Sequence, residues 1–205
     1  TCSHLVFFHA QILQPVDAEC SPVLEPVKAM NIVVLSGSPR KGANTDTMVE
    51  AFAETAREGS HAVEIVRVAS KKIAGCLGCQ YCAAHEGTCV QKDDMADVME
   101  SLKNADMVVF ASPIYWFDIT AQEKAVIDRL YAFGATGFPF TKTALLLDSH
   151  SDGVYDAAIT AYKVACAYCK WEDQGIVTIS GMEERDSMAS SPKLEEVREL
   201  ARKLA

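Results

Sequence analysis

Short apolar runs alternate with helical segments along the chain from Met30 onward. The run Asn31–Ser36 (NIVVLS) is continuously apolar and ends in a Gly/Pro loop, the pattern of a strand buried on both faces of a parallel sheet. In residues 95–102, by contrast, apolar residues recur at spacings of three and four, which places them on one face of a helix. This alternation predicts an α/β fold.

The pattern predicts a doubly wound parallel sheet of five strands with helices on both faces. We expect the strands at residues 31–36, 62–68, 106–112, 143–148 and 175–180. We expect the helices at residues 45–58, around 95–102, and at 120–131, 154–170 and 192–204. Ligands of such sheets bind beyond the carboxyl ends of the strands, so the loops after Ser36, Ser112 and Asp148 are predicted to form the functional site.

Composition narrows the class of protein. Residues 1–29 contain three prolines and lack the alternation, so we expect an extension outside the core fold and one domain at residues 30–205. No apolar run is long enough to cross a bilayer, and the formal net charge of -9 argues against nucleic acid as a partner. Eight cysteines without signs of secretion indicate a cytoplasmic protein, in which thiols stay reduced.

The loop after the first predicted strand, SGSPRKGANT, concentrates groups that bind phosphate at the start of a helix. It lacks the glycine pattern of dinucleotide-binding loops, and Ala43-Asn44 stand where a nucleoside-triphosphate loop needs Lys-Ser/Thr. A single phosphate monoester fits better, and the alternative is a strand–helix turn whose Gly and Ser residues only satisfy geometry. The candidate phosphate donors are Ser36, Ser38, Arg40, Asn44 and Thr45.

The loop after the third predicted strand, SPIYWFDIT, offers aromatic faces that can stack on a flat conjugated ring. The same aromatics could instead pack on the next helix or at a dimer interface. The candidate ring-binding residues are Pro113, Ile114, Tyr115, Trp116 and Phe117. On the following helix, Lys124, Asp128 and Arg129 are expected to form solvated ion pairs without a chemical role.

Four of the eight cysteines lie in one stretch, GCLGCQYCAAHEGTC, at residues 75–89. Their spacing is C-x2-C-x2-C-x6-C, and three cysteines at two-residue gaps resemble the run that wraps a four-iron cluster in bacterial ferredoxins. Free thiols, reduced or oxidised, are the second interpretation, and zinc is the third. The candidate ligands are Cys76, Cys79, Cys82 and Cys89.

These motifs together resemble the flavodoxin-like NADPH-dependent FMN reductase family, in its iron–sulfur flavoprotein branch. The resemblance covers residues 30–204 and implies a flavodoxin-like fold that binds FMN. It implies that the first loop holds the FMN phosphate and that residues 113–117 hold the ring. The polar loop at residues 148–156, which includes Ser149, is expected from its position to close the site. His150 in that loop is expected to be solvated. The resemblance further implies a [4Fe-4S] cluster at the cysteines and a homodimer or larger homo-oligomer.

The predicted function is an FMN-dependent oxidoreductase that takes electrons from NAD(P)H or ferredoxin and passes them to a small-molecule or protein acceptor. Two alternatives stay open. One is a cluster-free NAD(P)H:FMN or quinone reductase, and the other is a passive flavodoxin-like electron carrier. A phosphate-binding hydrolase is disfavoured because no activated nucleophile stands in the loop after Ser36.

Overall fold

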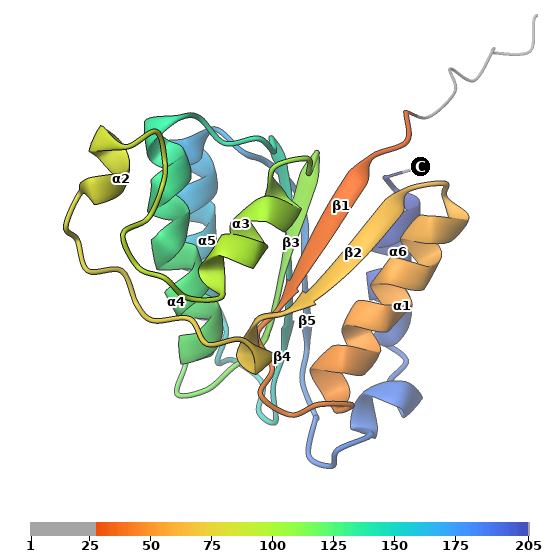
Figure 1. The fold of residues 1–205 in the computed structure, drawn as a ribbon. Helices are drawn as coiled ribbons and strands as arrows, with labels where there is room; N and C mark the ends of the chain where they lie inside the picture. The colour runs from red at the N-terminus through yellow and green to blue at the C-terminus, as the bar shows by residue number, and fades with distance from the viewer. Residues whose placement is uncertain (1–27, 205) are drawn as a thin grey trace, which may run out of the picture.

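The computed structural model describes residues 28–204, and Figure 1 shows them as one sheet between two layers of helices. The sheet has five parallel strands in the order β2-β1-β3-β4-β5. This is the flavodoxin-like order, with its switch point between β1 and β3. The predicted α/β, doubly wound fold is confirmed. The predicted extension lies almost wholly outside the described residues, so the division at residue 30 stays a prediction.

The strands lie close to their predicted positions. They are β1 (Asn31–Ser36), β2 (Ala62–Arg67), β3 (Met107–Pro113), β4 (Lys142–Asp148) and β5 (Glu172–Ile179). Every residue of β3, the central strand, is buried, as a continuous apolar run predicts. The strand β5 begins three residues earlier than predicted, because its first residues are polar and lie on the sheet edge, where Glu172 pairs with Lys142.

The helices that cover the sheet fall into two layers (Figure 1). They are α1 (Asn44–Glu58), α2 (Tyr81–Ala84), α3 (Met95–Leu102), α4 (Ala121–Arg129), α5 (Asp156–Cys169) and α6 (Leu194–Arg202), with 3-10 turns η1 (Val68–Ser70), η2 (Leu130–Ala135) and η3 (Ser187–Ser190). The sequence pattern did not predict α2, which lies within the cysteine-rich connection. The helix α6 begins at Leu194 without a side-chain cap, so the expected start at residue 192 was too early.

Two apolar cores hold the layers together, one on each face of the sheet. On one face, α1 and α6 pack through Phe52 and Val197 against Ile32 and Val34 of β1. On the other face, the helices α3 to α5 pack against the same sheet. Leu102 of α3 and Val108 of β3 belong to this second core. Because β1 and β3 pair in parallel, their carboxyl ends lie at the same edge of the sheet. Within residues 28–204, no helix is both long and apolar enough to cross a membrane.

Candidate functional site

Three loops meet at the carboxyl edge of the sheet around a cavity of about 260 Å³. The loop after β1 contributes Ser38, Arg40 and the start of α1, and the loop after β3 contributes residues 113–115. The loop after β4 contributes Ser149 and His150. The structure therefore brings together the three segments that the sequence pattern singled out. Eight of the predicted residues line the cavity: Ser38, Arg40, Asn44, Thr45, Pro113, Ile114, Tyr115 and Ser149.

The start of α1 presents unpaired backbone N–H groups to this cavity. Ala43, the residue before α1, makes no side-chain cap, so the first N–H groups of the helix are available to an anion. Arg40 is exposed at the cavity wall, and no ion pair among the described residues involves it. Ser38 accepts a hydrogen bond from the Arg40 N–H at 3.3 Å, which shapes the turn. These groups form a site that fits one phosphate.

Ser38 and Thr45 have hydrogen-bond partners within the protein, and so do two further predicted phosphate donors, Asn44 and Ser36. The Asn44 amide donates to the Glu184 carbonyl at 2.7 Å and accepts from the Met188 N–H at 2.9 Å, which ties α1 to η3. Ser36 is buried and donates to Asp46 at 3.5 Å. Ser36 does not line the cavity. The side chains of these two residues therefore shape the loop, and the backbone of Asn44 is what faces an anion.

Asp148, the last residue of β4, places a buried carboxyl beside the phosphate-sized site. Its Oδ1 accepts a hydrogen bond from Thr45 Oγ1 at 2.6 Å. Burial raises the pKa of Asp148 to about 6, against the opposing effect of the bond from Thr45. The sequence pattern placed Asp148 at a strand end and at the start of the polar loop, and assigned its carboxyl no role of its own. The protonation state of this residue therefore bears on anion binding.

The aromatic loop is exposed and strained. Tyr115 and Asp118 form an isolated antiparallel bridge, and the two residues between them have positive φ, 52° at Trp116 and 69° at Phe117. A non-glycine residue in this region is held there at a cost of roughly 1–3 kcal/mol. The Trp116 side chain is 92% exposed and that of Phe117 is 58% exposed. The structure thus leaves two large aromatic side chains uncovered in the segment after Tyr115, and neither Trp116 nor Phe117 lines the cavity.

Thr120, at the start of α4, connects the first and second loops. Its hydroxyl donates to the Gly37 carbonyl at 2.8 Å, and its N–H donates to Ser112 Oγ at 3.0 Å. In a capping box, the Thr120 N–H would instead bind the Glu123 carboxyl. The carboxyl of Glu123 is fully buried and has no hydrogen-bond partner among the described residues, and burial raises its pKa well above the usual value. A Cβ at Gly37 would lie 2.7 Å from Glu123 Cβ, which accounts for glycine there.

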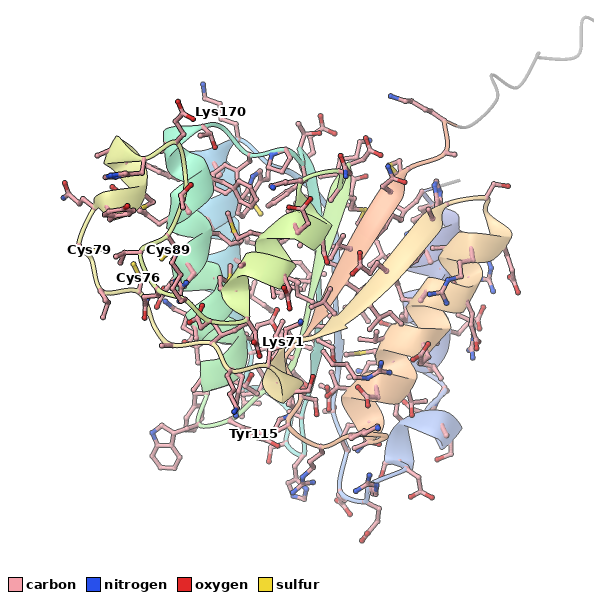
Figure 2. The ribbon with its side chains drawn as sticks, in the orientation of Figure 1. Lys71, Cys76, Cys79, Cys89, Tyr115 and Lys170 are labelled. Carbon is pink, nitrogen blue, oxygen red and sulfur yellow. The ribbon has the colours of Figure 1, made fainter. Side chains whose placement is uncertain are left out.

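The cysteines lie on a long connection between β2 and α3 that leaves the sheet edge (Figure 2). Cys76 and Cys79 are exposed, Cys82 and Cys89 are half-buried, and all four are free thiols. Left-handed backbone at Gly78, Gln80, Glu86 and Gly87 turns the connection back on itself. Within residues 28–204, no three Cys, His, Asp or Glu side chains are arranged to hold a metal ion. The donor set, four thiols in one closed loop, nonetheless fits a thiolate-bound cluster.

The expectation of a solvated ion pair is wrong for Arg129. Its side chain is only 2% exposed, and its guanidinium donates to both carboxylate oxygens of Asp93, at 2.9 and 3.0 Å. Burial acts to lower the pKa of Arg129, but Asp93 and Cys89 outweigh it and raise this pKa. Lys124 and Asp128 form the exposed pair that the sequence predicted. Arg129 was missed because Asp93 lies far away in the sequence.

A second and larger hollow, of about 770 Å³, adjoins the cysteine loop. Its walls come from α3, from the end of α4 with η2, and from residues 86–93. Cys89, Asp93 and Arg129 all line it. The buried pair and one predicted cluster ligand therefore belong to the same surface of the protein.

Comparison with known proteins identifies the family. Residues 30–167, more than half of the chain, match the family model of the NADPH-dependent FMN reductases. The chain is also 32% identical over 152 residues to an iron–sulfur flavoprotein of Archaeoglobus fulgidus, across 73% of this chain and 75% of that protein. The chain therefore belongs to the NADPH-dependent FMN reductase family.

Several iron–sulfur flavoproteins are similar to this chain. A second such protein of Archaeoglobus fulgidus is 41% identical over 105 residues, and one of Methanosarcina thermophila is 36% identical over 100 residues. These matches cover 51% and 49% of this chain and 47% and 52% of the relatives. The chain thus spans about half the length of these two relatives. They support the branch to which the sequence resemblance pointed.

Solved structures confirm the fold. An NAD(P)H:quinone oxidoreductase of Methanothermobacter marburgensis superposes with a TM-score of 0.69 at 19% identity, over 86% of this chain and 96% of that one. An FMN-dependent NADH-azoreductase of Bacillus anthracis, solved with FMN, gives a TM-score of 0.63 at 16% identity, over 86% of this chain and 100% of that one. Both share the flavodoxin-like sheet.

Proposed function

We propose that the protein is an FMN-dependent oxidoreductase that accepts electrons from a nicotinamide nucleotide. One observation carries the proposal: the uncapped start of α1 and Arg40 line the same cavity as Tyr115, the first aromatic residue of the loop that also carries Trp116 and Phe117. A phosphate monoester attached to a flat ring satisfies both halves of this arrangement. Membership in the FMN reductase family supports the same cofactor.

Each part of the cavity then has a binding role. The helix start, Ser38 and Arg40 hold the phosphate, and Thr45, whose hydroxyl donates to Asp148, lies beside it. Residues 113–117 and Ser149 enclose the ring, whose edge the backbone groups of this loop can read. When bound, FMN supplies hydride and single-electron chemistry, so no protein base is required. The protein's contribution is to bind the ring, orient it and shield it from water.

We further propose that Cys76, Cys79, Cys82 and Cys89 hold a [4Fe-4S] cluster. The support is the donor set of four free thiols on one closed loop, together with the names of the most similar relatives. Such a cluster supplies one-electron transfer. In the view of Figure 2, the labelled cysteines of the loop lie apart from Tyr115. A homodimer or larger assembly, a cytoplasmic location, and a small-molecule or protein acceptor belong to the same proposal.

The direct test of the flavin function is an anaerobic titration of the FMN-loaded protein with NADPH and, separately, with NADH. We expect stoichiometric bleaching of the flavin band by at least one of the two donors. Arg40→Ala should weaken FMN binding about tenfold or more, because a charge-assisted contact to phosphate is lost. Riboflavin, which lacks the phosphate, should bind the variant and the parent equally.

The control for this variant is Arg57→Ala. Arg57 donates to the Val63 carbonyl at the opposite end of α1, so its removal should leave FMN affinity unchanged. A flavin that neither nucleotide reduces would contradict the enzymatic proposal and favour a passive carrier. FMN and riboflavin affinities that fall together in Arg40→Ala would contradict the assignment of the phosphate site.

A further inference from the structure

The base of the cysteine loop is closed by a compact set of hydrogen bonds. Ala74 lies just before the loop and Asp93 just after it. The Ala74 N–H donates to the Asp93 carboxylate at 3.0 Å. The Ala74 carbonyl accepts from Arg129 at 3.0 Å. Both backbone groups of Ala74 are thus bound by one ion pair. A second pair of hydrogen bonds joins Lys72 and Asp94. The Lys72 N–H donates to the Asp94 carboxylate at 2.7 Å, and the Asp94 N–H donates to the Lys72 carbonyl at 3.2 Å.

Arg129 anchors this base to the body of the protein. It is the last residue of α4, and within residues 28–204 no other arginine or lysine is buried. Its planar guanidinium forks onto both oxygens of Asp93, a geometry that lysine cannot reproduce. Asp93 also accepts from the Met95 N–H at 3.3 Å, so the same carboxylate reaches the start of α3. The pair therefore joins α4, α3 and the two ends of the loop.

The remainder of the loop contacts η2 through α2, but its hydrogen bonds lie almost wholly within the loop itself. Gln91 Nε2 donates to the Gly75 carbonyl at 3.1 Å, which adds one bond just inside the base. Cys76, Cys79 and Leu77 are exposed, and the helix α2 buries none of its residues. A segment with so little apolar burial depends on its base for its conformation. Cys89, in turn, shares the wall of the neighbouring hollow with Arg129 and Asp93.

We propose that Arg129 is the positioning residue of the cysteine loop. Bound to Asp93 and Ala74, it closes residues 75–92 into a preformed loop and holds a positive charge beside Cys89. The segment that carries the four cysteines is then closed at its base before any metal arrives. The claim that this arrangement serves a cluster rests on the proposed function, whereas the closure of the loop does not.

The test compares Arg129→Lys, Arg129→Met and Asp93→Asn with Lys124→Met, a control that removes the exposed ion pair of the same helix. The first measurement is protease cleavage within residues 75–92 of the metal-free, FMN-loaded protein. We expect cleavage to be about tenfold faster in the three variants and unchanged in the control, because opening is local to the loop. FMN affinity should stay within about twofold of the parent, because the flavin site does not include Arg129.

The second measurement is titration of the metal-free protein with Co²⁺, followed by the thiolate-to-cobalt absorption. Loss of an outer contact to a metal site typically lowers affinity about 10–100-fold, and we expect a loss in this range for Arg129→Met. Arg129→Lys keeps the charge but loses the forked contact, so it should recover only part of the Co²⁺ affinity that Arg129→Met loses. Loss of loop packing alone would leave Lys and Met equivalent, so a difference between them supports a positioning role.

The outcomes separate loop closure from cluster binding. The proposal is overturned if Arg129→Lys has the same cleavage rate and the same Co²⁺ affinity as Lys124→Met. If Arg129→Met also loses FMN, its fold has failed, and Arg129→Lys and Asp93→Asn then decide the question by the same comparison. Faster cleavage in these variants with no Co²⁺ binding by the parent leaves loop closure established and removes the cluster from the proposed function.

Discussion

Thr45 Oγ1 donates a 2.6 Å hydrogen bond to Asp148 Oδ1 and so joins the start of α1 to the end of β4. The carboxyl that receives this bond is only 3% exposed and lines the proposed phosphate site. A dianionic phosphate and an ionised carboxylate repel each other strongly in a site with little water. Binding of FMN should therefore favour the protonated form of Asp148.

The first prediction concerns the pH dependence of FMN affinity. Burial raises the pKa of Asp148 to about 6, so the carboxyl is neutral below this pH and ionised above it. FMN affinity in the parent should fall by about tenfold as the pH rises from about 5.5 to about 7.5. In Asp148→Asn the affinity should be higher at neutral pH and depend less on pH. Fluorescence titration with FMN across this range provides the measurement.

Other titratable groups around the cavity require controls. Arg40, His150 and Glu183 also line it. His150→Gln should keep the pH dependence of the parent. Riboflavin should show little pH dependence in any variant, since it carries no phosphate. An Asp148→Asn protein whose FMN affinity keeps the parent's pH profile would rule out Asp148 as the coupled group.

The second prediction concerns the strained aromatic loop. Trp116 has a φ of 52° and a largely exposed side chain, so Trp116→Gly loses little packing and relieves backbone strain. We expect the FMN-free protein to gain about 1 kcal/mol of unfolding free energy and its FMN affinity to fall about tenfold. Urea unfolding and FMN titration measure the two effects.

Lys170 offers a matched control for this substitution. It has a φ of 59° at the carboxyl end of α5, and it does not line the flavin cavity. Lys170→Gly should stabilise the protein by a similar amount and leave FMN affinity unchanged. If both substitutions leave FMN affinity at the parent value, Trp116 does not contact the ring.

The third prediction concerns the buried carboxyl of Glu123. Burial raises its pKa in the folded protein well above the usual 4.5. The stability that depends on its protonation is therefore fully present below about pH 4.5 and is lost as the pH rises toward the folded pKa. Glu123→Gln cannot ionise, so its unfolding free energy should vary less with pH. Urea unfolding at several pH values between about 5 and 8 gives the comparison.

Glu123→Leu extends this test, because leucine removes the unpaired polar group as well as the charge. We expect it to be more stable than the parent at neutral pH by about 1–3 kcal/mol, the usual cost of an unsatisfied buried group. Glu54→Gln, an exposed change on α1, should have no effect. Equal pH dependence of stability in Glu123→Gln and the parent would show that the carboxyl ionises without cost.

Most of the fold could be predicted from local patterns in the sequence. The strands β1, β3 and β4 lie on continuous apolar runs, so burial on both faces identifies them directly. The edge strand β5 extends beyond its apolar run, because Glu172 and Asp173 take part in backbone pairing while facing water. A pattern based on apolar residues therefore misplaces its start.

The candidate site was predictable only where it depends on neighbours in the sequence. Most donors of the first loop, and Tyr115 of the second, follow strand ends, and the fold brings them to one cavity, whereas Trp116 and Phe117 do not line it. Arg129 and Asp93 could not be paired in advance, because their contact requires α4 to pack beside the cysteine loop. Glu123 resembles an exposed helix residue, and only the bond between Ser112 and the Thr120 N–H leaves its carboxyl unpaired. Thr120 and Glu123 alone would predict a capping box.

We propose above all that one chain holds both a flavin and a cysteine-bound cluster. The sharpest test is an anaerobic absorbance spectrum of the freshly purified protein, with iron and acid-labile sulfide assayed on the same sample. Replacing all four loop cysteines by serine gives the matched comparison, and Cys166→Ser, a buried thiol on α5, is the control. We expect flavin bands over broad cluster absorption, with about four iron and four sulfide per chain in the parent and the control. Flavin bands without iron or sulfide in the parent would contradict this proposal and leave a cluster-free flavin reductase.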